Sequence, residues 1–143
     1  MVDFKVFVKR MEQVEFYIRK EAITILKAQG QDIIKMVKEQ HHEGLNRDGE
    51  QMQSGYSAGY GKKRKQAGLQ TKFVDLHFSG KYHKSLKVVK QEGGIDVTST
   101  EPYAYYLRGM FPGQAGLTPE NAEKTAIVVA NILAPKIKKF LVR

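Results

Sequence analysis

The sequence predicts an α+β fold: a long N-terminal helix, or a bent helix pair, and a C-terminal helix packed on a small antiparallel sheet. Apolar residues recur at three- and four-residue steps through residues 3–43, which is the period of an amphipathic helix. Short runs within residues 73–100 instead alternate apolar and polar side chains, as strands with one buried face do. Residues 118–141 return to the helical pattern. With 143 residues, the chain (1–143) has the length of one domain.

The N-terminal helical region has clear boundary signals. Asp3 is a residue type that caps helix N-termini, and Gly44 stands where a left-handed residue ends many helices. Gly30 interrupts the apolar pattern without changing its phase, at a cost of ~1 kcal/mol relative to Ala inside a helix. Residues 3–43 are therefore expected to form two helices or one bent helix.

Three antiparallel strands are expected in the middle of the chain, over residues 73–78, 85–91 and 95–100. Ser79-Gly80 favours a turn after the first strand, and one turn of helix precedes the second. Glu92-Gly93-Gly94 supplies the hairpin turn between the last two strands, because glycine accepts the positive φ that such turns need.

The C-terminal part is expected to contain two helices. Residues 101–117 form a short helix that begins at Pro102, followed by a loop. Thr118-Pro119-Glu120 then combines a capping hydroxyl, a proline at the first helical position and an acid in the first turn, so a helix begins there. Pro135 is expected to kink or break this helix.

Composition excludes several classes of protein. The chain has no cysteine, so it has no disulfide framework, thiolate metal site or cysteine nucleophile. No apolar run approaches the ~20 residues of a membrane span, and the N-terminus lacks the apolar core of a secretory signal. The net charge is +9, and residues 61–90 hold nine Lys and Arg residues against one acid, Asp75. Such an uneven charge favours an anionic partner, either nucleic acid or an acidic protein surface.

Residues 44–72 are expected to form a Gly/Lys-rich arm with a short helix near 61–67. A connection of this length is unusual in a compact domain unless it is functional or a partner orders it, so we expect neighbouring molecules to hold the arm. Its run of four cations is either a solvated loop or a docking surface for phosphates or an acidic subunit. Its tyrosines would stack on exposed bases or anchor a protein interface. The candidate interface or anion-binding residues are Tyr56, Tyr60, Lys62, Lys63, Arg64, Lys65, Lys72, Lys81 and Lys84.

No motif points to catalysis, a cofactor or a metal. His41 and His42 are adjacent on a helix and point ~100° apart, so they are interpreted as two exposed histidines at a helix end. His77 is expected on the polar outer face of the first strand, where a general-base role has little support. The glycines before Lys62 lack the spacing and the flanking strand and helix of a phosphate-binding loop. We expect no catalytic residues, no cofactor and no metal.

Several short motifs, taken in order, resemble one family. Residues 74–86 read V-D-L-x-F-S-G-x-x-x-x-S-L, and Y-A-x-Y-L follows at 103–107. Upstream, residues 43–49 are similar to an EGLD-x-DG turn, with Asn46 in place of the more frequent Asp. A Y-S…Y…K…K…G loop spans 56–68, and G-L-T-x-E stands at 116–120. Over roughly residues 33–130 the chain resembles the neck and tail-completion proteins of tailed bacteriophages, also described as head–tail joining or virion-morphogenesis proteins.

This resemblance implies a non-enzymatic structural protein of the virion, located at the neck or the tail terminus and in the host cytoplasm during assembly. Identical copies would form a ring through heterologous contacts and dock on other neck, tail or portal-side proteins. The basic face would look either toward DNA in the channel, in non-specific contact, or toward an acidic partner. No membrane is involved in this interpretation. The alternative is a free-standing basic nucleic-acid-binding domain.

Overall fold

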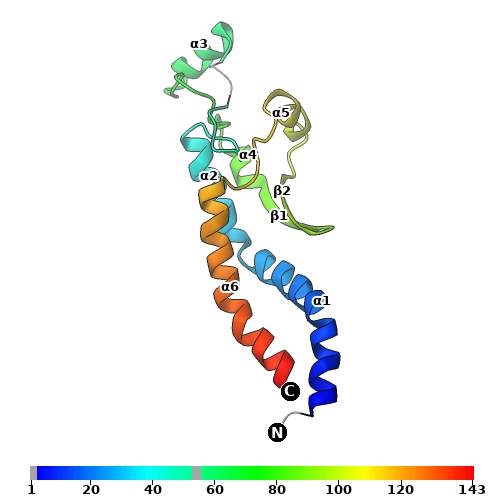
Figure 1. Ribbon diagram of the computed structural model, residues 1–143. Coiled ribbons are helices and arrows are strands. Elements are labelled where there is room, and N and C mark those ends of the chain that lie inside the picture. Colours follow the sequence, from blue (N-terminus) through cyan, green and yellow to red (C-terminus); the bar gives the residue numbers. More distant parts are fainter. Residues whose placement is uncertain (1–2, 53–55) are drawn as a thin grey trace.

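The computed structural model describes residues 3–52 and 56–143, and it confirms the α+β class. The helices are α1 (Phe4–Ala28), α2 (Gly30–His42), α3 (Ala58–Gln66), α4 (Lys81–Ser85), α5 (Ala104–Met110) and α6 (Pro119–Val142). The strands are β1 (Leu86–Gln91) and β2 (Gly94–Ser99). In Figure 1, α1 and α6 run antiparallel at one end of an elongated molecule, where both termini lie. The sheet, α3, α4 and α5 gather around α2 at the other end.

The N-terminal helices begin and end where the sequence predicts. The Asp3 side chain accepts a hydrogen bond from the Lys5 N–H at 2.8 Å, and Gln29 separates α1 from α2. Gly44 has a φ of +76° and ends α2 with paired hydrogen bonds, from its own N–H to the His41 carbonyl and from the Leu45 N–H to the Gln40 carbonyl. This is the Schellman arrangement, which satisfies the last carbonyls of a helix.

The sheet is an antiparallel hairpin whose register runs from Leu86 opposite Ser99 to Gln91 opposite Gly94. Glu92 and Gly93 form its two-residue turn, with Gly93 at a φ of +79°, as predicted. The hairpin packs on α2 to form one apolar core, whose buried members are Ile33, Ile34, Val37, Tyr82, Leu86, Val97 and Ala104.

The strand predicted over residues 73–78 is absent, so the described chain contains two strands instead of three. Val74 and Asp75 are both buried, although neighbours on a strand face opposite sides. The Asp75 carboxylate accepts a hydrogen bond from the His77 N–H at 2.9 Å, and Leu76 between them has a φ of +57°. This segment is therefore a folded loop, in which a buried carboxylate takes a backbone donor that a strand would use in its ladder.

Helix α6 begins as predicted, with the Thr118 side chain accepting from the Asn121 N–H at 3.3 Å and Pro119 in the first turn. It packs antiparallel along α1 through a second buried cluster of Ile25, Val129 and Leu133. Of the two effects expected of Pro135, a kink or a break, the break does not occur, because α6 continues to Val142.

Contacts beyond Pro135 offset the hydrogen bond that the proline removes. The Tyr17 and Phe140 rings stack at 4.1 Å between centroids, and the Lys136 ammonium lies 2.9 Å from the Glu21 carboxylate. The predicted and observed starts of α5 differ by two residues, because the helix begins at Ala104 and not at Pro102. No helix within the described ranges combines the length and apolar character needed to cross a membrane.

Candidate functional site

The candidate site is a cleft of ≈ 810 Å³ between α3 and α5, with the loop before α4 as its floor. Two buried polar clusters position its walls, one beneath α3 and one beneath the loop that follows α5. The sequence predicted Tyr56 and Arg64 as candidate interface residues, but it did not predict the buried contacts that form either cluster.

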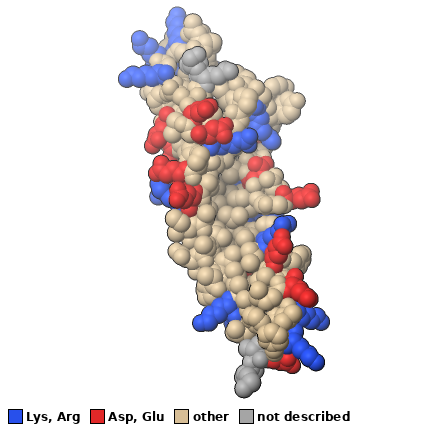
Figure 2. Space-filling model, in the orientation of Figure 1, with Lys and Arg blue, Asp and Glu red and all other residues tan. Residues whose placement is uncertain are grey.

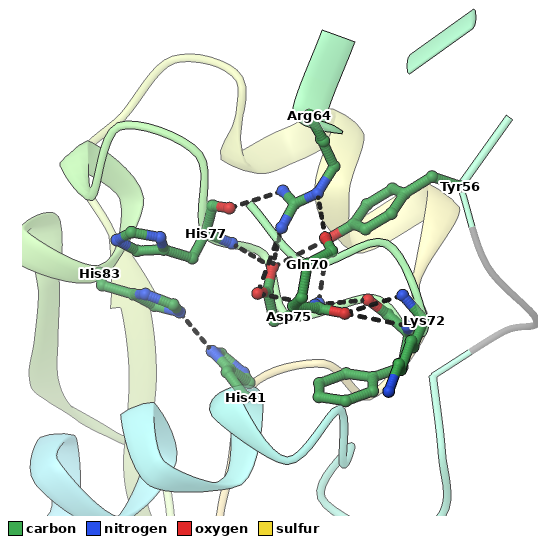
Figure 3. Close-up of polar contacts among 9 residues, drawn as sticks. His41, Tyr56, Arg64, Gln70, Lys72, Asp75, His77 and His83 are labelled. Carbon is green, nitrogen blue, oxygen red and sulfur yellow. Dashed lines mark hydrogen bonds and ion pairs between the residues drawn. The ribbon is translucent and has the colours of Figure 1, made fainter. Parts of the chain in front are cut away.

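The first cluster forms around Arg64, which lies on α3 and is 1% exposed. Its Nη2 group donates to both Asp75 carboxylate oxygens at 3.1 and 3.2 Å. Its Nε group donates to the Gln70 carbonyl at 3.0 Å, and Nη1 donates to the His77 carbonyl at 2.6 Å (Figure 3). The planar guanidinium thus joins α3 to the two chain segments that follow it.

Asp75 receives a full set of donors. Besides Arg64, the Tyr56 hydroxyl donates at 2.9 Å and the Gln70 side-chain amide at 2.9 Å. Burial alone would raise the pKa of the Asp75 carboxyl, but these hydrogen bonds, the His77 N–H and the Arg64 charge outweigh it and hold that pKa below its usual value. Burial also raises the pKa of Tyr56 to about 12. Asp75 is therefore a charged carboxylate, and both of its oxygens accept hydrogen bonds from the protein itself.

The second cluster lies at the end of α2 and holds the loop after α5. His41 is fully buried, with Nδ1 3.1 Å from His83 Nε2 and Nε2 2.5 Å from the Gln114 carbonyl. Since a carbonyl only accepts, His41 Nε2 carries a hydrogen, its Nδ1 accepts, and His83 Nε2 donates to it. Gln40 adds further bonds to the same loop, donating to the Gly116 carbonyl at 2.8 Å and accepting from the Thr118 N–H at 3.0 Å.

Burial lowers the pKa of His41, although the Gln114 carbonyl acts in the opposite direction. Burial, followed by the charges of neighbouring histidines, lowers the pKa of His83 to about 3. Both rings are therefore neutral at pH 7. The interpretation of His41 as an exposed residue at a helix end is wrong; His42 is exposed, as predicted. Within residues 3–52 and 56–143, no group of three or more His, Asp or Glu residues is arranged to hold a metal ion.

The cleft itself is lined by aromatic rings and by two lysines. Tyr60, Phe78 and Tyr103 come from α3, from the floor and from the turn before α5, and each is 38–39% exposed. The Tyr60 and Phe78 ring centroids are 6.0 Å apart. The Lys63 ammonium lies 5.4 Å from the centre of the Phe78 ring, and Lys81 lines the cleft at the start of α4. An aromatic surface with adjacent cations suits a ligand that is both flat and anionic.

The structure divides the nine predicted residues into three groups. Tyr60, Lys63 and Lys81 line the cleft with accessible side chains. Tyr56 and Arg64 also border it, but the Tyr56 hydroxyl is bound to Asp75 and its ring lies 4.2 Å from the guanidinium carbon. The remaining lysines are exposed and do not line the cleft; they are Lys62, Lys65, Lys72 and Lys84. The interpretation of Arg64 as one of four solvated cations is wrong, because its side chain is buried and forms an ion pair with Asp75.

Within its described residues, 44–52 and 56–72, the arm is anchored in part by the rest of its own chain, and the expectation that a partner also holds it stays a prediction. The Arg64 cluster anchors the second part, and the predicted short helix is confirmed as α3. In the first part the Asn46 side chain accepts from the Asp48 and Glu50 N–H groups, and Met52 is buried.

Sequence reasoning missed the α5 wall of the cleft, where Leu107, Met110 and Phe111 join Tyr103. One signal was present: residues 103–111 contain four aromatic side chains but only one charge, Arg108. Comparison of the chain with protein-family models, curated proteins and solved structures finds no match. The resemblance to phage neck and tail-completion proteins therefore stays a prediction.

Proposed function

We propose that this protein is a non-enzymatic structural protein of a phage virion, at the neck or the tail terminus, that assembles as a ring of identical copies. The family resemblance supplies the virion assignment. The observation that supports self-association is the outer surface of α6, which is uncharged from Thr125 to Pro135.

This segment spans about 16 Å of helix at 1.5 Å per residue. Only Thr125, Val129 and Leu133 are buried against the rest of the chain, while Ile127, Val128 and Ile132 are 56%, 41% and 37% exposed. Figure 2 shows a surface without charged side chains over the left and centre of the middle part of the molecule, with charged groups along the right edge and at both ends. A contiguous apolar surface of this kind marks an interface more often than a free face.

Other exposed apolar residues lie at both ends of the molecule. Phe4, Val8 and Met11 stand at i, i+4 and i+7 on α1, with exposures of 76%, 42% and 48%. Tyr105 and Tyr106 project from α5 at the other end, 76% and 69% exposed. Apolar contacts at different places on one chain are what a head-to-tail ring needs.

The test is the oligomeric state by light scattering coupled to size-exclusion chromatography, with Ile132→Glu as the variant. We expect the native chain to form a closed oligomer and Ile132→Glu to shift it toward monomer with an unchanged circular dichroism spectrum. Lys138→Glu is the matched control, since it places the same residue on the same helix outside the uncharged segment. A native chain that stays monomeric, and joins no phage neck or tail component on mixing, contradicts the proposal.

The second candidate, a free-standing basic nucleic-acid-binding domain, is favoured by one observation. The only acid in residues 61–90 is neutralised by Arg64, which leaves eight exposed lysines in that segment without a nearby acid from it. Tight binding of nucleic acid by a monomer, with a steep loss of affinity in salt, would favour this candidate over the ring.

A further inference from the structure

We propose that the cleft between α3 and α5 binds single-stranded nucleic acid, with an unpaired base stacked on its aromatic rings and the flanking phosphates against Lys63 and Lys81. This inference goes beyond the proposed structural role, because it applies equally to a ring subunit and to a free monomer. It also specifies which residues and which form of nucleic acid are involved.

The cleft is concave, and its aromatic rings are partly exposed to solvent within it. Tyr60, Phe78 and Tyr103 each leave about two fifths of their surface open, although they come from three different parts of the chain. Rings exposed singly on a convex surface are ordinary, whereas rings that converge on one cleft form a stacking surface. Every nucleobase has a π-face, so such a surface accepts bases with little regard to sequence.

Hydrogen bonds hold the surroundings of these rings in place. Arg64 fixes the α3 wall through four hydrogen bonds, and the buried Tyr82 side chain, whose ring centroid is 6.5 Å from that of Tyr103, donates to the Gln114 side chain at 2.5 Å. A preformed site loses less conformational entropy when a ligand binds.

The segments on the α3 side of the cleft carry a strongly one-sided charge. The segments that supply α3, the floor and α4 contain one acid, Asp75, which is buried and paired with Arg64. Their lysines remain exposed, two of them in the cleft itself and others close by in the sequence, and Figure 2 shows Lys and Arg side chains projecting at this end of the molecule. A polyanion matches this field, and phosphates on either side of a stacked base would meet Lys63 and Lys81.

Unpaired strands fit this arrangement better than a duplex. In a duplex the flat face of each base is covered by the next base pair, so rings recessed in a cleft cannot reach it. A duplex would therefore meet only the lysines, whereas a single strand uses both the lysines and the rings.

The experiment measures fluorescence anisotropy of a labelled dT15 strand and of a 15-base-pair duplex at two salt concentrations, ~50 and ~200 mM. Tyr60→Ala, Phe78→Ala and Tyr103→Ala are tested singly and together. Removal of the ring that stacks on the base is expected to lower the affinity for dT15 about 5- to 150-fold, with little change in the affinity for the duplex. Tyr105→Ala is the matched control, because Tyr105 lies on α5 two residues after Tyr103, is more exposed and does not line the cleft.

The lysines give an independent readout. The double variant Lys63→Ala/Lys81→Ala is expected to weaken the binding of both the strand and the duplex. For dT15, the slope of log affinity against log salt concentration should fall in magnitude by about 0.7 per lost phosphate contact. Lys90→Ala, on β1 and outside the cleft, is the control. Circular dichroism melting checks that each variant is folded. We expect all of them to fold, because the substituted side chains are partly exposed.

Three outcomes would overturn the proposal: no binding of dT15 by the native chain, equal loss of strand and duplex affinity in the aromatic variants, or no loss in the combined aromatic variant. Tighter binding of an acidic, tryptophan-containing peptide than of dT15, abolished by the same aromatic variants, would overturn it in favour of a peptide site. Light scattering on the same samples reports the oligomeric state, so failure of the ring proposal is recorded separately.

Discussion

Removal of the Arg64 guanidinium is expected to destabilise this protein far more than removal of any neighbouring lysine. Arg64→Ala leaves the Asp75 carboxylate and the Gln70 and His77 carbonyls without this donor, in a place that is almost fully buried. Breaking a buried ion pair by removing one partner costs ~3–5 kcal/mol of unfolding free energy. Lys63→Ala, one residue away and exposed, is expected to change it by no more than ~0.5 kcal/mol.

The assay is urea unfolding followed by circular dichroism, which suits a mainly helical chain without tryptophan. With an m-value of ~1–3 kcal/mol per molar urea, the Arg64→Ala midpoint should fall by at least ~1 M. Arg64→Lys keeps the charge but loses the planar donor group, so an intermediate loss is expected. If Arg64→Ala and Lys63→Ala unfold at the same urea concentration, the assignment of Arg64 as the anchor of α3 is wrong.

Two further predictions concern the buried histidines and the end of α2. The pKa of His83 is about 3 in the folded protein, against an ordinary 6.5, so between these values only the unfolded chain binds the proton. The unfolding free energy should therefore fall as the pH is lowered from about 6.5 toward 3, by at most ~1.4 kcal/mol per pH unit for this group. The measurement is the melting temperature as a function of pH. Its pH dependence should be weaker in His83→Gln than in the native chain, and unchanged in the control His42→Gln. At the α2 terminus, Gly44→Ala should cost more than Gly49→Ala in urea unfolding. Both glycines have a φ near +77°, which costs ~1–2 kcal/mol for alanine, but only at Gly44 would the new Cβ meet the Phe73 ring, at 2.7 Å. Equal losses at the two positions would show that Phe73 moves aside freely.

The elements that the sequence predicted well are those in which local chemistry decides the outcome. Each of these elements depends on residues within a few positions of one another. They are the α1 cap at Asp3, the break before Gly30, the glycine end of α2, the Glu92-Gly93 turn and the start of α6. Such signals are readable because the groups that satisfy each other are neighbours in the chain.

The failures share a different cause. The alternation of Val74, Leu76 and Phe78 satisfies the strand pattern, but the Asp75 carboxylate between them is turned inward by Arg64, eleven residues earlier in the chain. Arg64 in turn looked like one of four solvated cations, since nothing in its immediate neighbours distinguishes it from Lys63 or Lys65. The candidate site was half predicted for the same reason: Tyr60, Lys63 and Lys81 were identified from composition, whereas the α5 wall reaches the cleft only through the folding of the chain.

The sequence by itself determined where helices and turns begin and end, because caps, glycines and prolines act on the backbone beside them. It also determined that one segment carries a large excess of positive charge. Only the tertiary structure decided which charged and polar groups leave water, because that choice depends on partners far away in the chain. Arg64 is buried because Asp75, Gln70 and His77 meet it together, and His41 because His83 and Gln114 do so. A polar side chain can be buried at low cost only when every partner is in place at once, and that condition is set by the fold.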